Sequence, residues 1–543
     1  MWVTTPRVPP ACEMPCALRP YSRGKIRQNM TPVVTCWLAD LGRKGAACKR
    51  RARVVVCVIL VIAGSGAAQI FHPEIPRAWD DKEVARVEVP LAQKDRSPRY
   101  LTSEQYYALK VRPIYRSYPA YVKGREPAGY RESLKQKEPE IIFDPSKLRT
   151  TEDWIQAGKL VFDYGVFFRP APAEAPSMDR LHAPVSPDGV VAPLLGGYRY
   201  VVRRKGEVEL WGLNSCARCH TRLMPDGSLV AGAQGSIGFP QPAATLAALR
   251  EFTPQQVRRS VDREWRAYGA PWIMGREAFE AEITNDEIIR RLAAAQSGVL
   301  ARQGTSTSHP PHIPSLIGVE DIKYLDATGL GHHRSIGDLM RYAIINEGLD
   351  TMAHYGDFQP STGIEDTSFN AEPGTRFSDE QLYALALYVY SLKPPPNPNP
   401  MDDRALRGRR IFQQQGCPVC HTPPLYTNNK LTPAMGFQVP EDLLKSESIL
   451  NVVVGTDPTL ALKTRRGTGF YKVPSLRGVW YRNAFGHGGQ AETLEEWLDP
   501  ARLKDYYVPK GFHLGPGAIK GHEFGLKLAS GERESLIAFL KTL

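Results

Sequence analysis

The sequence predicts a mainly α-helical fold made of two tandem domains with long loops, preceded by an extended N-terminal arm. A five-residue motif, C-x-x-C-H, occurs twice, and helix-forming segments recur around it in the same order. A Pro-rich segment, residues 394–400, separates the two copies and is typical of a stiff, extended linker. Glycine and proline, 46 residues each, indicate long loops between the helices.

The N-terminal segment, residues 1–68, has the composition of an export signal. A basic stretch at 49–53 precedes an apolar run at 54–63, and small residues follow at 64–68. This order is typical of a secretory signal peptide, and the apolar run is short for a membrane span. We expect an exported, periplasmic protein, with an uncleaved anchor in the inner membrane as the alternative. Because the basic part is long, translation could also start at Met30 or later.

The formal net charge of +12 does not indicate nucleic-acid binding. Residues 1–68 hold eleven of the 69 lysines and arginines and two of the 57 acids, which assigns +9 of the charge to the predicted signal. Elsewhere no basic run is interleaved with aromatic residues. We therefore expect no nucleic-acid partner.

The cysteines show the same division. Five of the nine lie in residues 1–68, and the remaining four all belong to the two C-x-x-C-H motifs. Exported proteins usually use additional cysteines for disulfides. Here the sequence after residue 68 has none outside the motifs, so every thiol of that part is assigned to them.

C-x-x-C-H is the attachment motif for c-type haem. Two thiols one helical turn apart add to the two vinyl groups of one porphyrin, and the histidine becomes the proximal ligand of the iron. The motif residues are Cys216, Cys219 and His220 in the first domain and Cys417, Cys420 and His421 in the second. A zinc site would need a second ligand pair near each motif, and a redox-active dithiol has no use for the histidine. We therefore predict two covalently bound haems c.

Matching segments surround the two motifs. Residues 157–162 and 407–412 form a predicted helix before each motif, and Pro-Ser-Leu, Gly-His and a final helix follow each motif in the same order. Ser378 and Gln381 have the spacing of a capping box, and Ser530 is expected to open the last helix as a capped one.

These repeats place the boundaries of two tandem cytochrome c-type haem domains, at 151–393 and 401–543. Residues 69–150 are rich in proline and tyrosine with little periodicity, so they are interpreted as an extended arm over the haem domains, with disorder as the alternative. The long insertion before the first motif contains two strand-like segments, at 198–202 and 207–210.

The second domain reads Tyr-Lys-Val-Pro-Ser-Leu-Arg-Gly-Val at 471–479, then Phe-Gly-His at 485–487 and Thr-Leu-Glu-Glu at 493–496. With the two haem motifs, this stretch resembles the bacterial di-haem cytochrome c peroxidase superfamily, which includes tryptophan-oxidising di-haem enzymes and rubber oxygenases. The resemblance covers roughly residues 150–543. It implies that one haem, typically the N-terminal one, meets peroxide or dioxygen, while the other relays electrons from a small redox donor protein. In some relatives a calcium ion lies between the domains.

The second haem departs from the pattern that the resemblance implies. Peroxidases of this superfamily usually place a distal methionine after the motif that matches His487, but the corresponding position is Ala501 and no methionine follows Met435. His522 is the best substitute for the distal ligand and His513 the second, and Met435 is a further alternative. An iron with two histidines has a lower potential than one with histidine and methionine, because methionine raises it.

The distal side of the first haem stays open at this point. Met352 and His354 occupy a position that corresponds to the distal candidate of the second domain, so either could ligate the iron. Arg465, Arg466 and Lys472 could pair with haem propionates, although a solvated surface is as good an interpretation.

Catalytic candidates beside the first haem come from the Gly-His region and from two tryptophans. His332 and His333 could face the iron, and Arg334 could place a positive charge near a developing negative one. In the superfamily a tryptophan often lies between the haems, and Trp265 and Trp272 are at a plausible distance after the first motif, although packing is the simpler role for each.

Three functions remain open. The chain could be a peroxidase-like oxidoreductase that reduces peroxide at the first haem with electrons relayed by the second. It could be a non-catalytic electron-transfer cytochrome with both irons saturated, or a dioxygen-using di-haem oxygenase. The distal ligand of the first haem separates these hypotheses, because catalysis needs an open coordination position.

Overall fold

The computed structural model describes residues 71–93, 96–165, 167–170, 186–190, 197–213, 215–236, 243–302, 304–346, 353–360 and 374–543. The chain divides into two units, Met1–Ala67 and Ala68–Leu543. The predicted export signal lies outside the described residues, so it stays a prediction. Within the described ranges, no helix is both long and apolar enough to cross a membrane.

Residues 71–150, the described part of the arm predicted at 69–150, form short elements that share a hydrophobic core with residues 154–389. Trp79 is fully buried in that core and stacks on Tyr106, with 5.3 Å between ring centroids. The elements are α1 (Asp81–Val84), α2 (Ser103–Ala108), β1 (Lys110–Val111), β2 (Ser117–Pro119), α3 (Tyr130–Lys135) and the 3-10 helix η2 (Pro145–Lys147).

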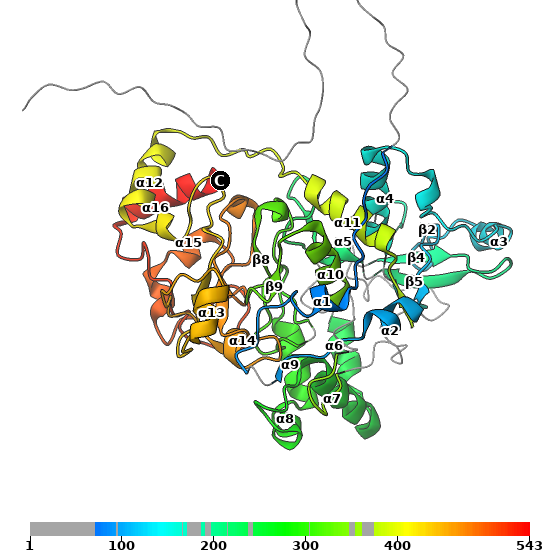
Figure 1. Cartoon of the computed structure of the whole chain (residues 1–543), viewed down its shortest axis with the longest axis horizontal. Helices are drawn as coiled ribbons and strands as arrows, with labels where there is room; N and C mark the ends of the chain where they lie inside the picture. Colours follow the sequence, from blue (N-terminus) through cyan, green and yellow to red (C-terminus); the bar gives the residue numbers. More distant parts are fainter. Residues whose placement is uncertain are drawn as a thin grey trace, which may run out of the picture. The chain divides into compact units, whose positions relative to one another are not determined.

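A pair of long helices accompanies each haem motif. In the first half α4 (Thr151–Tyr164) packs against α11 (Asp379–Ser391), and in the second half α12 (Asp403–Gln414) packs against α16 (Ser530–Lys541), as Figure 1 shows. α4 and α12 contain the repeated segments that were predicted as helices before each motif, and α11 and α16 are the predicted closing helices. All four helices are therefore confirmed.

Each helix pair crosses at a glycine of the repeated segment. A Cβ atom on Gly158 would lie 1.9 Å from the carbonyl oxygen of Ala384, and one on Gly408 would lie 1.8 Å from that of Ser535. Two backbones can approach this closely only where one helix carries no side chain. The sequence repeat is thus also a repeat of the packing.

Of the two predicted N-caps, the one of α11 is observed and the one of α16 is not. Ser378 and Gln381 form the predicted capping box, since each side chain bonds the backbone amide of the other, at 3.1 and 2.9 Å. The cap expected at Ser530 is wrong. Ser530 is already the first residue of α16, and the N-cap is Ala529, whose amide donates to Glu532.

The insertion before the first motif supplies most of a four-stranded sheet. Its strands are β3 (Phe167–Pro170), β4 (Tyr198–Val201) and β5 (Glu209–Leu213), which confirms both predicted strand segments. The sheet order is β2-β4-β5-β3, with antiparallel neighbours, so the arm strand β2 forms one edge. The arm and the insertion are thereby joined by backbone hydrogen bonds.

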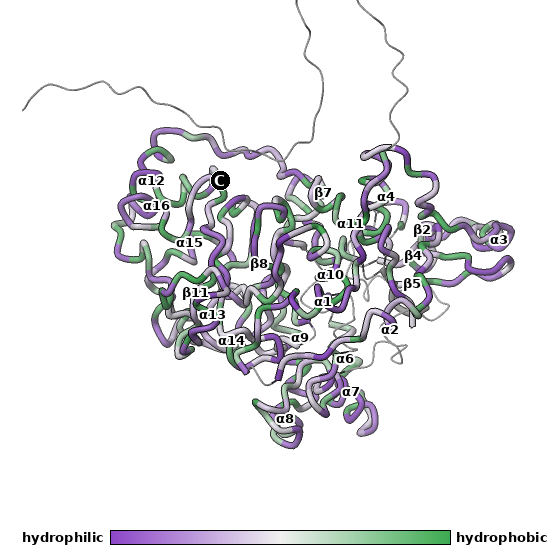
Figure 2. The backbone as a smooth tube through the Cα atoms, in the orientation of Figure 1, coloured by the Kyte–Doolittle hydropathy of each residue, from purple (hydrophilic) through white to green (hydrophobic). Residues whose placement is uncertain are grey.

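The remaining elements are short and are connected by long loops. Most of the regular structure in the described residues is helical. Figure 2 shows a largely hydrophilic α7, which agrees with its run of arginines, glutamines and acids. In the first half the elements are α5 (Cys216–Cys219), β6 (Thr221–Leu223), β7 (Leu229–Ala231), α6 (Ala243–Arg250), α7 (Pro254–Tyr268), α8 (Arg276–Glu282), α9 (Asn285–Ala294), η5 (Val319–Asp321), β8 (Tyr324–Leu325), β9 (Gly331–His332), α10 (Ile336–Asn346) and β10 (Thr375–Arg376). In the second half they are η7 (Cys417–Val419), β11 (Leu431–Pro433), α13 (Glu441–Ser446), α14 (Thr459–Leu462), β12 (Phe470–Lys472), η8 (Val479–Tyr481), α15 (Leu494–Trp497) and η9 (Pro500–Leu503).

Candidate haem sites

The first C-x-x-C-H motif forms a single helical turn. α5 carries Cys216 and Cys219 on that turn, and the amide of His220 closes it by donating to the carbonyl of Cys216 at 2.9 Å. The ring of His220 is oriented by the carbonyl of Pro314, 3.1 Å from its Nδ1 atom. Pro314 belongs to the Pro-Ser-Leu segment of the repeat. Because Nδ1 donates to this carbonyl, Nε2 keeps a lone pair for a metal.

The second motif repeats this arrangement with a tighter turn. The amide of His421 donates to the carbonyl of Cys417 at 2.8 Å, over the 3-10 helix η7. Nδ1 of His421 lies 3.1 Å from the carbonyl of Tyr426, so a backbone carbonyl again orients the ring, here from the loop after the motif. Pro474 is the counterpart of Pro314 in the sequence repeat. The two proximal candidates are therefore oriented in the same way.

Burial keeps these groups neutral. It lowers the pKa of His220 to about 4 and also lowers the pKa of His421. Burial raises the pKa of Cys417 to about 11 and raises that of Cys420. Redox-active C-x-x-C cysteines need the opposite shift, toward a reactive thiolate. The second motif is thus suited to neutral thioethers and a neutral imidazole ligand.

His522 lies opposite His421. The ring centroids are 6.4 Å apart and the ring planes differ by 59°. Two imidazoles on one metal, with metal–nitrogen bonds of about 2.0 Å and ring centres about 1.1 Å beyond each nitrogen, would have centroids about 6.2 Å apart. The observed separation is therefore one at which both rings could hold the same iron. Burial lowers the pKa of His522 to about 4, which keeps this ring neutral as well.

A buried arginine, Arg502, holds the loop that carries His522. Its guanidinium donates to the carbonyls of Trp497 at 2.7 Å, Gly521 at 2.9 Å and His522 at 2.8 Å, and also to that of Ile519. His522 needs such support because its backbone is left-handed, with φ of 47°. Sequence reasoning missed Arg502, because nothing nearby in the chain marks it as a clamp.

The residues present fit a haem at each motif. In the described part of the chain no group of three or more histidines, cysteines and acids is arranged to hold a metal ion. The four motif cysteines are not joined by disulfides. Nδ1 of His522 is buried with no hydrogen-bond partner, which is expected of a ring nitrogen whose partner would be a bound group.

The other distal candidates for the second haem do not face His421 in this way. Met435 is 48% exposed. His513 directs Nδ1 to the carbonyl of Gly511, 2.8 Å away. Among the alternatives left open by the sequence, the geometry thus favours His522.

The catalytic candidates of the first domain are bound to other groups. His332 holds the carbonyl of Arg86 with Nδ1 and the carboxylate of Glu447 with Nε2, at 2.9 and 3.0 Å. Burial opposes protonation there, but the hydrogen bond and charge of Glu447 outweigh it and raise the pKa of His332. With both ring nitrogens acting as donors, His332 has no lone pair for iron.

His333 and Arg334 are engaged in the same way. His333 contacts the carbonyl of Ile322 at 2.7 Å and the hydroxyl of Tyr390 at 2.6 Å. Arg334 pairs with the carboxylate of Asp338 at 2.8 Å. Within the described residues, neither side chain hydrogen-bonds or stacks with His220, so their catalytic role stays a prediction.

The remaining first-domain candidates are not joined to His220 either. His354 is exposed, and its backbone pairs with Arg99. Met352 lies outside the described residues. Trp265 packs against Phe279 and Trp272 against Tyr355, with centroids 5.1 and 5.4 Å apart. These contacts agree with packing roles for both tryptophans.

The suggested propionate partners separate into two groups. Arg465 donates to the carbonyls of Gly269 and Ala267 at 2.8 and 2.9 Å, which ties the second half to α7.

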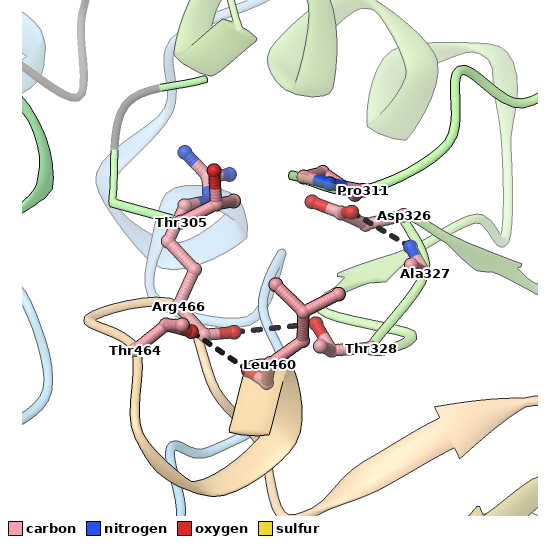
Figure 3. Close-up of a pocket in the computed structure, with 8 residues that line it drawn as sticks. All are labelled: Thr305, Pro311, Asp326, Ala327, Thr328, Leu460, Thr464 and Arg466. Atoms are coloured by element: carbon pink, nitrogen blue, oxygen red, sulfur yellow. Dashed lines mark hydrogen bonds between the residues drawn. The ribbon is translucent and has the colours of Figure 1, made fainter. Parts of the chain in front are cut away.

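Arg466 borders a small pocket together with Asp326, shown in Figure 3. The pocket lies between residues 305–328 and 460–466, and its lining residues are Thr305, Pro311, Asp326, Ala327, Thr328, Leu460, Thr464 and Arg466. Lys472 belongs to a different cluster, described below.

Comparisons with known proteins give distant structural neighbours only. No model of a known protein family matches the chain, and no curated protein matches it. A hydrazine synthase of Kuenenia stuttgartiensis aligns over 55% of this chain and 92% of its own, at 16% identity and a TM-score of 0.27. A MauG-like protein associated with microbial copper homeostasis aligns over 46% and 78%, at 16% identity and 0.29. A variant of the diheme peroxidase BthA from Burkholderia thailandensis aligns over 58% and 90%, at 17% identity and 0.22. TM-scores this low do not establish a shared fold.

Proposed function

We propose that the protein is an exported di-haem c-type cytochrome with peroxidase-like activity. Cys216, Cys219 and His220 would hold the first haem, and Cys417, Cys420 and His421 the second. The second haem would relay electrons from a small redox donor protein, and the first would meet peroxide.

The asymmetry of the two sites carries this proposal. His421 has a second imidazole, His522, with ring centroids 6.4 Å apart, so the two rings would hold one iron that only exchanges electrons. In the described residues no second histidine faces His220 in this way. A coordination position left free at the first site is what reduction of peroxide requires.

The protein's own residues supply position and environment. The cysteines anchor the porphyrin edge, and the carbonyls of Pro314 and Tyr426 hold the two imidazoles in the tautomer that presents Nε2. Burial keeps both rings neutral and excludes bulk water. When bound, the haem iron supplies one-electron chemistry and, where a position is free, a binding site for peroxide or dioxygen.

Electron delivery through the second haem is supported by its position near the surface. Val419, between the two cysteines of the motif, is 63% exposed, and Phe524, two residues after His522, is 46% exposed. Exposed apolar side chains beside a redox centre are the kind of surface that a small, transient redox partner contacts.

A non-catalytic electron-transfer cytochrome is the second candidate. The pair of histidines at the second site favours it, because such an iron has a lower potential than one with methionine and is less suited as a high-potential donor. A dioxygen-using oxygenase is a third reading of the same free position.

Absorption spectra of the purified, exported protein test the proposal. Haem staining after denaturing electrophoresis should show covalent haem, lost at the second site in Cys417→Ala. The ferric protein should contain one high-spin and one low-spin haem, and cyanide should convert only the high-spin one. His522→Ala should make the second haem bind cyanide as well. A colourless protein would refute the haem assignment. Two low-spin haems that react with neither cyanide nor peroxide would refute the peroxidase activity and support a non-catalytic electron-transfer cytochrome.

A further inference from the structure

Three basic side chains gather between the residues that orient His220 and His421. Lys472 ends β12 and stands two residues before Pro474, and its amide donates to the carbonyl of Ala327 at 3.1 Å. Arg482 follows η8 and donates to the carbonyl of Ser475, the residue after Pro474, at 3.1 Å. Arg302 is the third, and its guanidinium donates to the hydroxyl of Tyr342 at 2.9 Å.

The cluster has fewer acids than bases. Arg302 forms an ion pair with Asp326, at 3.3 Å. Lys472 reaches only the carbonyl of Tyr324, at a long 3.4 Å. Arg482 donates to the carbonyls of Ser475 and Arg477. Across the described ranges, no carboxylate lies within ion-pair distance of Lys472 or Arg482.

Two buried nitrogen donors of this cluster also make no hydrogen bond. Nη2 of Arg302 and Nε of Arg482 are buried and have no hydrogen-bond partner. Burial lowers the pKa of Lys472, to about 8, and that of Arg482, as expected when cations lack counter-charges. Leaving buried cations uncompensated costs several kcal/mol per ion. An anion bound here would supply the missing counter-charge through charge-assisted hydrogen bonds.

The cluster adjoins both haem sites. The charge of Arg302 acts on His220 and that of Arg482 on His421, lowering the pKa of each ring after the larger effect of burial. Lys472 contacts the backbone of Tyr324 and Ala327, on either side of Asp326, the partner of Arg302. Arg482 bonds the carbonyl of Ser475, three residues after Lys472. An anion held here would therefore adjoin the segments that carry both histidines.

We propose that Arg302, Lys472 and Arg482 form one anion receptor, shared by the two haem sites, that binds carboxylates of the haem propionates. This inference rests on the proposed haem binding and adds to it the residues that receive the acidic edge of the cofactor. With Asp326 counted, the three cations carry a net charge of +2, which one carboxylate from each haem would balance, so removing one cation leaves uncompensated negative charge beside the irons. Positive charge near an iron favours its reduced state, because reduction lowers the charge of the metal.

Reduction potentials measured by spectroelectrochemical titration of the holoprotein test the proposal. Lys472→Met and Arg482→Met each remove one positive charge at similar volume. We expect Arg482→Met to lower the ferrous-to-ferric ratio of the second haem at a fixed potential roughly tenfold, or about 59 mV for a one-electron couple. Lys472→Met should lower the potentials of both haems. Lys504→Met, which removes an exposed charge of the second half, should change neither, because water and salt screen it. Unchanged potentials in both cluster variants would overturn the proposal.

A charge-conserving variant covers the case in which the methionine variants do not fold. Arg482→Lys keeps the charge but replaces a planar, forked donor by a point charge. Its potentials should stay close to the wild type, while the propionate bending bands of the resonance Raman spectrum should shift. Propionate bands that do not move in this variant would overturn the proposal.

A free anion could satisfy the same chemistry, and a phosphate titration separates the two sources. Potentials that are independent of phosphate concentration support bound propionates, and a phosphate-dependent difference between wild type and Arg482→Met contradicts them. The haem content of each sample is measured first, so failure of the haem assignment is distinguished from failure of the receptor.

Discussion

Replacing Arg502 by methionine tests how the second site keeps two imidazoles facing each other. Arg502 is fully buried and donates to four backbone carbonyls, two of which belong to Gly521 and His522 themselves. Methionine fills a comparable volume but donates nothing. The loop then loses the bonds that hold its left-handed backbone.

The size of the effect follows from those bonds. A hydrogen bond to a charged group contributes about 1.5–3 kcal/mol. If only the two bonds to Gly521 and His522 count toward the position of the loop, their loss is about 3 kcal/mol or more, which is roughly a hundredfold in the equilibrium between His522 placed and His522 released. A measurable part of the second haem should therefore become high-spin in Arg502→Met.

The assay is the ferric absorption spectrum, with circular dichroism as the check on folding. Arg404→Met is the matched control, because Arg404 forms a surface ion pair with Glu534, at 2.6 Å. Exposed pairs of this kind contribute 1 kcal/mol or less, so its spectrum should not change. Arg502→Lys should restore part of the low-spin signal by replacing some of the donors. A folded Arg502→Met with an unchanged low-spin spectrum would refute the positioning role of Arg502.

Three further predictions concern stability and pH. Gly158→Ala should lower the free energy of unfolding by about 3 kcal/mol, measured by denaturant titration, because its Cβ atom would lie 1.9 Å from the carbonyl oxygen of Ala384; an unchanged midpoint contradicts the close helix crossing. Burial raises the pKa of Glu264 to about 7, so the folded protein loses stability as pH rises from about 4.5 to 7. Glu264→Gln should therefore be more stable than wild type at pH 8, by up to about 3 kcal/mol, and equal to it near pH 4; a difference that does not vary with pH is evidence against this. The raised pKa of His332 and the lowered pKa of Glu447 mean that their pair stabilises the fold fully between about pH 4.5 and 6.5, and that this contribution is lost as pH rises through the raised value of His332. Glu447→Gln should therefore lower the free energy of unfolding more at pH 6 than at pH 9, as measured by denaturant titration at each pH. The reverse order would show that the pair is not charged.

Local patterns predicted those parts of the fold that short-range rules decide. The helices around Gly158 and Gly408, the capping box at Ser378 and the strands of the insertion all depend on residues a few positions apart. Each has a periodicity or spacing that can be read along the chain. Ser530 failed as a cap by a single position, which is the usual scale of error at a helix end.

The residues of the candidate site also fall into those that a short sequence motif marks and those that only the fold brings together. Chemistry that resides in one short segment, the two C-x-x-C-H motifs with His220 and His421, can be predicted from the sequence alone, and the sequence also ranked His522 first among possible distal ligands. It could not decide between His522 and its competitors, because that depends on which loop is brought opposite His421. Only the tertiary structure places the two rings 6.4 Å apart.

The residues that support the site were decided by tertiary structure alone. Arg502 and Arg482 act on backbone carbonyls and on charges that come from distant parts of the chain, so no motif marks them. Arg334, one of the catalytic candidates from the sequence, forms an ion pair with Asp338, a contact that the sequence did not predict. Covalent attachment obeys spacing along the chain, whereas hydrogen bonding and charge balance in a buried site obey distances in space, and only the packed fold determines those.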